Sequence, residues 1–403
     1  MNVLFLSLGE FDDLAAGSVH IDLMKEFAKY HEVYLICKTE KRFGQETFLV
    51  KEHGINILRV KTGNIKNTNI IEKGISTVLV EPQFKKACKE YLSNIKFDLV
   101  IYTTPPITFA NVVNYIKKRD NAKTYLLLKD IFPQNAVDLD MMSVKGPKSI
   151  IYKYFRKKEK KLYAISDKIG CMSPANVRYV LDHNPELGLD KLEVCPNAIE
   201  VIDKSIDEAK RIAIRNKYGI PLDKKIFVYG GNLGKPQGIP FLMNCLKAQN
   251  NDKAYFLIAG NGTEFGKLEF FLNENNLSNV KLMKRLPKED YDMMVAACDV
   301  GMIFLDYRFT IPNFPSRLLS YMQAKLPVFV CTDDNTDVGE IVVNGKYGWY
   351  CQSNSVNSFV ETINSIVDED FKQKGNIAFN YLSSHYSVSK AYKQIISSYD
   401  SLL

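Results

Sequence analysis

The stretch Phe314-Pro315-Ser316-Arg317-Leu318-Leu319-Ser320-Tyr321-Met322, followed by Lys325-Leu326-Pro327-Val328, decides how the second half of the chain folds. It predicts a loop that opens a helix over residues 316–324, and the helix then leads into a buried strand at 328–331. The first turn of a helix carries unpaired N–H groups, and here a hydroxyl (Ser316) and a cation (Arg317) stand beside them. Such a loop favours the binding of a diphosphate, to which Ser316 could donate and whose charge Arg317 could neutralise.

A glycine-rich loop lies upstream, at Tyr229-Gly230-Gly231-Asn232-Leu233-Gly234-Lys235-Pro236-Gln237-Gly238. Glycines allow the backbone to approach a phosphate closely and leave its N–H groups uncovered. No Gly-Lys-Ser/Thr follows at the Walker spacing, so the loop is not a P-loop. A third turn, Ala259-Gly260-Asn261-Gly262-Thr263, follows the next predicted strand and lies at the same end of the same sheet. These loops together predict a nucleotide-binding site in the second half of the chain.

Short apolar strands alternate with amphipathic helices along the whole chain, a pattern that predicts parallel sheets joined by helical crossovers. The expected strands are residues 3–7, 32–37, 55–60, 98–103, 124–128, 168–172 and 192–195, then 226–230, 254–259, 280–284, 300–305, 328–331 and 348–351. The expected helices include residues 21–30, 84–95, 240–248, 290–297 and 316–324.

The 403 residues leave room for two domains. A charged helical segment near residues 202–218 separates the two series of strands. We therefore place one domain at residues 1–205 and a second at 206–386, and we expect the last helix, residues 387–403, to pack back on the first domain.

The bulk composition excludes several classes of protein. Hydrophobic residues make up 46% and charged residues 25% of the chain, as in ordinary soluble proteins. No apolar run approaches the ~20 residues that span a bilayer. The first eight residues are expected to form a strand and not a signal peptide. The eight cysteines are scattered without a CxxC pair, which is typical of reduced thiols in a cytoplasmic protein.

No residues at zinc spacing and no G-x-S-x-G motif occur. Asp138-Leu139-Asp140 resembles a metal-binding DxD, but it lies within a short helical segment and not at a strand end. We therefore predict that no metal is bound.

The net charge of +7 is concentrated in one segment, residues 148–161. Its basic residues, opposed by Glu159 alone, are Lys148, Lys153, Arg156, Lys157, Lys158, Lys160 and Lys161. Apolar residues interleave with them at helical spacing. This pattern suits a helix that binds an anionic membrane surface. A surface helix with one solvated face explains the pattern equally well. Nucleic acid is disfavoured, because no recognition motif accompanies these residues.

Three loops of the first half are expected beyond the carboxyl ends of strands, where open α/β sheets bind ligands. They contain Gly17, Thr103-Thr104-Pro105-Pro106, and Lys129-Asp130-Ile131-Phe132-Pro133-Gln134. Lys129 and Asp130 are placed for chemistry, although a loop-capping carboxylate beside a solvated lysine would look the same. His20 is more typical of a structural histidine than of a catalyst.

Together these motifs resemble the retaining GT-B glycosyltransferases of family 4, which build bacterial surface polysaccharides. The resemblance covers nearly the whole chain and rests on the Gly17 loop, residues 130–138, Pro196-Asn197, Gly231-Asn232-Leu233-Gly234, Gly260-Asn261-Gly262 and Pro315-Ser316-Arg317-Leu318-Leu319. It implies two Rossmann-like domains whose parallel sheets face each other across a cleft. The first would bind the acceptor and the second the nucleotide sugar. Asp-Ile-Phe-Pro-Gln at 130–134 looks most like the subgroup that adds N-acetyl-L-fucosamine or similar amino sugars.

The resemblance also implies roles for individual residues. Those for the nucleotide sugar are Gly17, Gly231, Asn232, Gly234, Lys235, Gln237, Gly260, Gly262, Leu286, Pro315, Ser316, Arg317 and Ser320. Those for catalysis are Asp130 and Arg317, and those for the acceptor or a membrane are Lys129, Lys153, Arg156, Lys157 and Lys160. The sequence departs from the family's Glu-x7-Glu pair, since Pro312 and Ser320 occupy the matching positions. It also has Asn232 and Gln237 where Arg and Lys are common.

The implied reaction moves a sugar, an N-acetylamino sugar by the subgroup resemblance, from a UDP-sugar to a lipid-linked saccharide. It would proceed with retention and without metal or cofactor, and the leaving phosphate would act as the base. The enzyme would be cytoplasmic and peripheral at the inner face of the plasma membrane. Two alternatives stay open: a non-catalytic nucleotide-sugar-binding or scaffold relative, and a UDP-sugar 2-epimerase. The epimerase is disfavoured because none of the five histidines stands beside the glycine loops.

Overall fold

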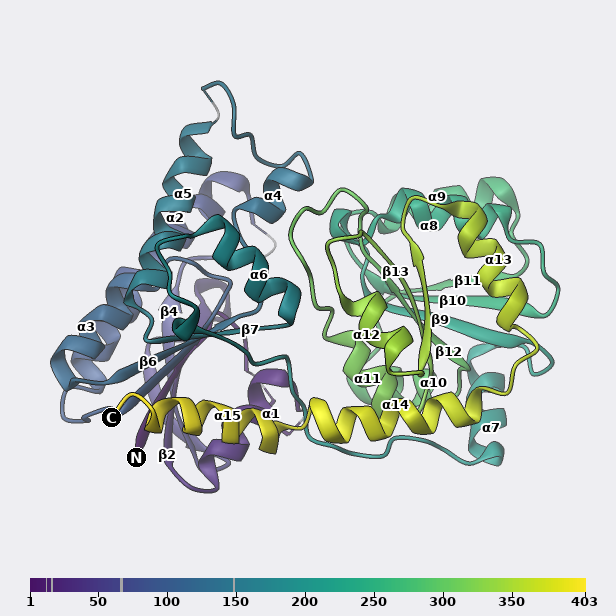
Figure 1. Ribbon diagram of the computed structural model, residues 1–403. Coiled ribbons are helices and arrows are strands. Elements are labelled where there is room, and N and C mark those ends of the chain that lie inside the picture. Colours follow the sequence, from purple (N-terminus) through teal and green to yellow (C-terminus); the bar gives the residue numbers. More distant parts are fainter. Residues whose placement is uncertain (12, 16, 66–67, 148) are drawn as a thin grey trace. The chain divides into compact units, whose positions relative to one another are not determined.

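The computed structural model contains two compact units, each built on one sheet with helices on its faces (Figure 1). One unit comprises Met1–Glu200 and Val388–Leu403, and the other comprises Val201–Ser387. The structure describes residues 1–11, 13–15, 17–65, 68–147 and 149–403, so Ala16 and Lys148 of the segments discussed above lie outside it. The predicted α/β class with two parallel-sheet domains is confirmed.

The first unit has an eight-stranded sheet in the order β3-β4-β2-β1-β5-β6-β7-β8. Its strands are β1 (Asn2–Leu6), β2 (Glu32–Glu40), β3 (Phe48–Glu52), β4 (Ile55–Thr62), β5 (Leu99–Thr103), β6 (Lys123–Leu128), β7 (Lys168–Cys171) and β8 (Leu192–Val194). Its helices are α1 (Val19–Ala28), α2 (Ile70–Tyr91), α3 (Ala110–Asp120), α4 (Gln134–Asp138), α5 (Ser149–Ile165), α6 (Pro174–His183) and α15 (Val388–Asp400). All strand pairs are parallel except β3–β4.

Helices cover both faces of this sheet, which is why its strands are almost continuously apolar. On one face α1 and α15 pack together, and Phe27 and Ile395 belong to a core cluster with Phe5 and Leu35 of the sheet. Elsewhere in the unit α2 contacts α3, and α3 contacts α5. The last helix therefore completes the core of the first unit.

The second unit has a six-stranded, fully parallel sheet in the order β11-β10-β9-β12-β13-β14. Its strands are β9 (Lys225–Asn232), β10 (Ala254–Asn261), β11 (Val280–Met283), β12 (Val300–Phe304), β13 (Val328–Thr332) and β14 (Gly348–Gln352). Its helices are α7 (Glu208–Tyr218), α8 (Ile239–Ala248), α9 (Phe265–Asn275), α10 (Lys288–Ala296), α11 (Arg317–Gln323), α12 (Val338–Asn344), α13 (Val356–Ile366) and α14 (Phe371–His385). Because its strands are parallel, the turns that follow β9, β10 and β12 lie at one edge of the sheet.

Two elements of the first unit differ from the sequence prediction. The helix expected at residues 84–95 begins at Ile70 and contains Pro82, which is exposed. Pro82 has no N–H to donate to the carbonyl of Val78, and the helix continues through it at the cost of that one hydrogen bond. Strand β3 was not predicted, since its residues are only partly buried and read weakly as a strand. It pairs with β4 through a tight turn at His53-Gly54, both with positive φ.

The domain boundary predicted near residue 205 falls in the segment between β8 and α7, where the units divide at Glu200 and Val201. Across the part of the chain that the structure describes, no helix is long and apolar enough to cross a membrane.

Candidate functional site

Arg317 and the glycine turn after β9 meet in the second unit. Arg317 is the first residue of α11, and its Nη1 donates a hydrogen bond to the carbonyl of Gly230. Its guanidinium carbon lies 4.4 Å from the centre of the Tyr229 ring. Gly231 has a φ of 134°, and a Cβ there would stand 2.6 Å from Nη2 of Arg317. The two loops that the sequence singled out separately therefore form one site.

Two buried tyrosines brace this turn. The hydroxyl of Tyr321 accepts a hydrogen bond from the N–H of Gly230 at 3.2 Å and lies 3.1 Å from the carbonyl of Met302. The hydroxyl of Tyr291 occupies the space that a Cβ on Gly230 would need, 1.9 Å away. Burial raises the pKa of Tyr291 to about 12 and that of Tyr321 well above its usual value, so both phenols are neutral. Neither tyrosine was predicted to belong to the site, although Tyr321 lies one helical turn after Arg317.

The turn after β10 packs directly on the turn after β9. The parallel register of the two strands continues through Gly231 and Gly260. A Cβ on Gly260 would lie 1.9 Å from the carbonyl oxygen of Gly231, and one on Gly262 would lie 2.1 Å from that of Leu233. These two glycines are thus required by the close approach of the backbones, independently of any ligand.

The remaining predicted residues of this unit line the same edge of the sheet. Gln237 Oε1 accepts hydrogen bonds from Asn232 Nδ2 at 2.8 Å and from the N–H of Gly234 at 3.2 Å, which fixes the glycine loop. Asn261 Oδ1 accepts from the N–H of Arg285 at 3.3 Å, which attaches the loop carrying Leu286. Lys235 and Ser316 are exposed, whereas Ser320, Pro315 and Leu286 are partly buried.

The start of α11 offers fewer free donors than its sequence predicts. The helix has seven residues, and the N–H groups of Leu318 and Leu319 already donate to the carbonyls of Pro315 and Ser316, at 3.2 and 3.1 Å. The Ser316 hydroxyl caps no backbone N–H. Arg317 is therefore the principal charged group of this site.

Asp130 lies just after β6 in the first unit and is held from several sides. Nδ2 of Asn135 donates to both of its carboxylate oxygens at 2.9 Å. The Thr104 hydroxyl accepts from the N–H of Asp130 at 3.2 Å and donates to its carbonyl at 3.0 Å. Burial raises the pKa of Asp130 to about 6, against the opposing effect of the Asn135 hydrogen bonds. A carboxylate with this pKa can exchange a proton near neutral pH.

Lys129, the residue before Asp130, is electrostatically coupled to His20. Burial lowers the pKa of Lys129 to about 8. Burial and the charge of Lys129 hold the pKa of His20 well below its usual value. Gly17, with a φ of 65°, opens the turn before α1, and the Asp22 carboxylate accepts from the N–H of Ser18 at 3.0 Å. Besides the Asp130 carboxylate, the first unit thus holds a buried amine and a neutral imidazole that interact with each other.

Most of the basic segment forms α5, and its cationic side chains differ in how far they are exposed. Lys153, Lys157 and Lys160 are exposed, and Lys160 pairs with Glu186 at 3.0 Å. Arg156 is partly buried, and it bonds Glu159 at 2.5 Å and the carbonyl of His183 at 2.7 Å. The physical reason is Glu159, a buried carboxylate that needs a cationic partner.

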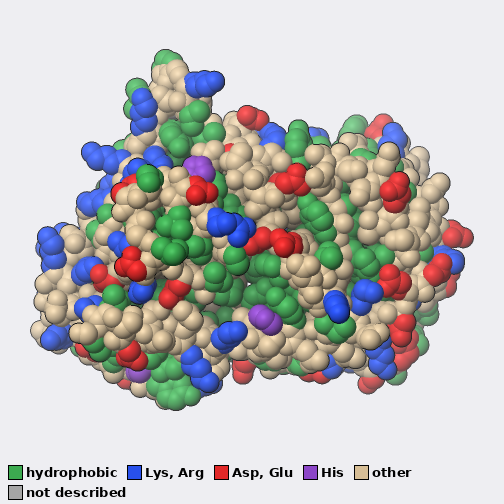
Figure 2. Space-filling model, viewed as in Figure 1, with side chains coloured by type: hydrophobic (Ala, Val, Ile, Leu, Met, Phe, Trp, Pro, Cys, Tyr) green, Lys and Arg blue, Asp and Glu red, His purple; other side chains and the backbone are tan. Residues whose placement is uncertain are grey.

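Large apolar side chains are also exposed on α5. Ile150 is 69% exposed, Ile151 56% and Tyr154 45%. In Figure 2 apolar and basic side chains gather on the end of the first unit that carries α5. This end of α5 is therefore both apolar and basic.

Metal ligands do not cluster in the described part of the chain, where no three His, Cys, Asp or Glu side chains are placed to hold an ion. Asp138 lies in α4 and accepts a hydrogen bond from Gln134 Nε2 at 2.8 Å. Asp140 follows the helix with a φ of 58°.

With this geometry in place, the chain can be compared with known proteins. Residues 210–379 match the family Glycosyl transferases group 1, so the second unit carries a domain of that group. Together with the relatives below, this match indicates a nucleotide-sugar-dependent glycosyltransferase, which confirms the predicted class of enzyme.

Two curated relatives are glycosyltransferases. The chain is 24% identical over 293 residues to the probable glycosyltransferase WbjE of Pseudomonas aeruginosa, covering 72% of this chain and 71% of the relative. It is 23% identical over 250 residues to the putative colanic acid biosynthesis glycosyl transferase WcaI of Escherichia coli K12, covering 61% and 60%. The chain is thus related to enzymes of polysaccharide biosynthesis.

Solved structures share the fold along the whole chain. A sucrose-phosphate synthase from Thermosynechococcus elongatus has a TM-score of 0.78 at 16% identity and covers 100% of this chain and 98% of its own. Anabaena Alr3699/HepE in complex with UDP-glucose has a TM-score of 0.71 at 15% identity, with 100% of both chains covered. The predicted GT-B fold is thereby confirmed.

Proposed function

We propose that this enzyme transfers a sugar from a UDP-sugar to a lipid-linked saccharide during assembly of a bacterial surface polysaccharide. The observation that carries the proposal is the contact between Arg317 and the Gly230–Gly231 turn, which sets a fixed cation beside exposed backbone. The relationship to WcaI, named for colanic acid biosynthesis, supports a polysaccharide product. The shared fold with HepE, which was solved with UDP-glucose, supports a uridine nucleotide.

In this proposal the diphosphate lies against Gly231 and the exposed Ser316. Arg317 is already held by the Gly230 carbonyl and the Tyr229 ring, so it need not reorganise as the glycosidic bond breaks. A preorganised cation stabilises the charge that develops on the leaving phosphate. The acceptor oxygen bonds the anomeric carbon on the face from which the phosphate leaves, and the leaving phosphate takes the hydroxyl proton. Attack on that face gives retention, and the step requires no metal.

The acceptor hydroxyl is oriented by the first unit in our proposal. Asp130 is mostly ionised at neutral pH and can accept a hydrogen bond from it, while Lys129 can neutralise an anionic group of the acceptor. We propose an N-acetylamino sugar as the transferred group because residues 130–134 resemble the enzymes that use such donors.

Nucleotide binding is the first test of this function. At ~100 times its Kd, UDP should stabilise the folded chain by about 2.7 kcal/mol, with or without Mg²⁺, whereas CMP at the same concentration should not. A thermal unfolding series with UDP, GDP, ADP and CMP measures this. No stabilisation by any nucleotide would contradict the donor site, and stabilisation only with Mg²⁺ would contradict the metal-independent mechanism.

Turnover separates the proposed transferase from its alternatives. A UDP-sugar should release UDP when a lipid-linked saccharide is added and should remain unchanged without it. Conversion of the free UDP-sugar to its 2-epimer would identify an epimerase. Binding without any release would identify a non-catalytic relative.

We also propose that α5 holds the enzyme at an anionic membrane, where a lipid-linked acceptor resides. Exposed Ile150, Ile151 and Tyr154 can enter the interface while lysines of the same helix meet anionic headgroups. Each lysine near such a surface contributes about 1 kcal/mol.

Replacing Lys153 and Lys157 by glutamine should weaken sedimentation with phosphatidylglycerol vesicles by roughly tenfold or more. The matched control replaces Lys210 and Lys372, two exposed lysines of the second unit, by glutamine. Equal losses in both double variants would show that net charge alone, and not α5, drives the binding.

A further inference from the structure

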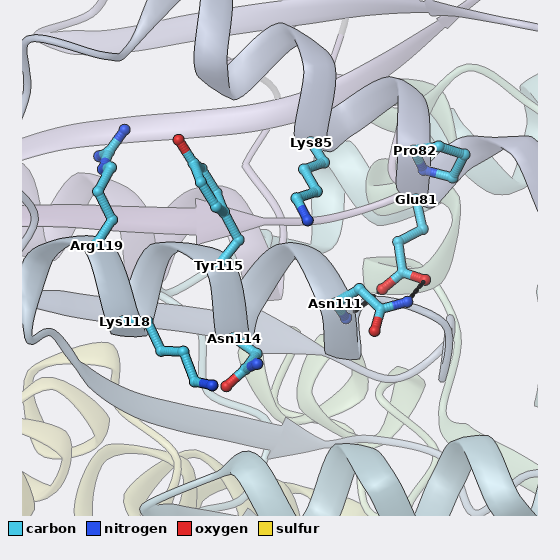
Figure 3. A pocket seen from close by; sticks show the side chains of 8 residues that line it. All are labelled: Glu81, Pro82, Lys85, Asn111, Asn114, Tyr115, Lys118 and Arg119. Atoms are coloured by element: carbon cyan, nitrogen blue, oxygen red, sulfur yellow. Dashed lines mark hydrogen bonds between the residues drawn. The ribbon is translucent and has the colours of Figure 1, made fainter.

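A groove between α2 and α3 of the first unit has a volume of about 710 Å³ (Figure 3). Glu81, Pro82 and Lys85 line it from α2, and Asn111, Asn114, Tyr115, Lys118 and Arg119 line it from α3. The volume lies within the roughly 300–1,000 Å³ of small-molecule sites. None of these residues belongs to the loops that carry the proposed function.

The lysines of this groove have no acidic partner. Among the residues that the structure describes, Lys85, Lys118 and the neighbouring Lys89 take part in no salt bridge. Lys85 and Lys89 are one helical turn apart, a spacing at which like charges repel. Both ammonium groups lie 5.3 Å from the centre of the Tyr115 ring, which partly offsets the repulsion through cation–π attraction. The fold therefore keeps two cations together without neutralising them.

The other charged groups of the groove are engaged elsewhere. Both carboxylate oxygens of Glu81 accept hydrogen bonds from Asn111. One accepts from the backbone N–H, and the other accepts from Nδ2 at 2.9 Å. Glu81 thereby caps the start of α3. The Arg119 guanidinium holds the Asp120 carboxylate at 2.6 and 2.7 Å and the carbonyl of Ile95 at 2.7 Å. What remains for a ligand is a pair of lysines beside the Tyr115 ring, Lys85 and Lys89. In Figure 3 Lys85 points toward α3 on the side of Tyr115, whereas Lys118 and Asn114 point away from α2.

We propose that this groove binds a phosphate group. Lysine ammonium groups are compact charges with freely turning donors, which suits a tetrahedral oxyanion, whereas the fork of Arg119 that would favour a planar carboxylate is occupied. The phosphate can belong to a soluble phosphorylated molecule or to a lipid headgroup. Exposed Ile75, Val78 and Leu79 precede the groove on α2, which is why a lipid surface belongs among the probes.

The test uses the full chain and two probes, inorganic pyrophosphate and vesicles containing phosphatidylglycerol. Saturating UDP is present throughout, so that a nucleotide site in the second unit does not contribute. The test variant carries K85Q and K89Q, and the control carries K86Q, an exposed lysine of α2 that lies 3.7 Å from Glu90. Calorimetry measures pyrophosphate binding, and co-sedimentation measures vesicle binding.

We expect the double variant to lose at least tenfold in affinity for one probe, while K86Q stays within about twofold of the unmodified chain. A loss confined to pyrophosphate assigns the groove to a soluble phosphate, and a loss confined to vesicles assigns it to a headgroup. Failure of the unmodified chain to bind either probe overturns the proposal. Equal affinities in all three proteins, or equal losses in both variants, overturn it as well.

Discussion

Replacing Arg317 by alanine should lower kcat/KM for the UDP-sugar by well over tenfold. A charge-assisted contact to a developing phosphate charge is worth roughly 2 kcal/mol or more, which corresponds to about thirtyfold in rate. The variant also removes the bond to the Gly230 carbonyl and the cation over the Tyr229 ring. Steady-state kinetics with the UDP-sugar and a saccharide acceptor measure the effect. The R317K variant keeps the charge but loses the forked guanidinium, so its kcat/KM should lie between those of the unmodified enzyme and R317A.

The partly buried position of Arg317 makes a stability control necessary. Arg211 is a partly buried arginine of the same unit and pairs with Asp299 at 2.5 Å, at the side of α7 and away from the glycine turns. Arg211→Ala should reduce the unfolding temperature but leave the turnover of folded enzyme close to normal. If a folded R317A enzyme turns over normally, Arg317 has no part in catalysis.

Replacing Asp130 by asparagine should have two opposite effects: lower turnover and higher stability at neutral pH. The pKa of Asp130 is raised from its ordinary value to about 6 by burial. As the pH rises from about 4 to about 6, the unfolded chain ionises this group while the folded chain keeps it protonated, so the unmodified protein loses stability. The neutral amide avoids this loss, which is about 3 kcal/mol at neutral pH.

A neighbouring side chain can accept a hydrogen bond from the new amide. Among the described residues, Oδ1 of Asn135 is buried without a hydrogen-bond partner, and it can accept from the asparagine at position 130. Urea unfolding at a series of pH values measures the stability difference, which should be near zero below about pH 3 and constant above about pH 7. Asp182→Asn, an exposed carboxylate of the same unit, is the control and should show little change.

The pH dependence of turnover provides a second readout for Asp130. Turnover of the unmodified enzyme should rise as the pH passes through about 6, because only the ionised carboxylate accepts the acceptor's hydroxyl proton in a hydrogen bond. A D130N enzyme with normal turnover, or a profile without a step near pH 6, would exclude this role.

The strands and the glycine turns could be predicted because both follow simple rules. Apolar runs of strand length alternate with helices, and parallel strands bring their carboxyl ends to one edge. That reasoning was sufficient to place Gly231 and Gly260 together. The direct contact between Arg317 and Gly230 could not be predicted, because it depends on how far α11 approaches β9.

The contacts that could not be predicted from the sequence all depend on the direction of a side chain. Tyr291 and Tyr321 read as ordinary core aromatics, and only the structure shows that their hydroxyls reach Gly230. Arg156 lies in a dense run of cations, but the buried carboxylate of Glu159 turns it inward. Sequence periodicity assigns a residue to one face of a helix or strand. It does not show which polar group the side chain will contact on that face.

The position of α15 has a consequence for synthesis on the ribosome. Ile395 is buried among residues of α1 and the first sheet, and Ser398 Oγ lies 2.7 Å from both carboxylate oxygens of Glu193. These contacts join the start of the nascent chain to residues translated after the whole second unit. The first unit must therefore wait, with part of its apolar surface uncovered, while the whole second unit is translated and until α15 emerges. During that interval we expect a chaperone to bind the uncovered apolar surface of the first unit.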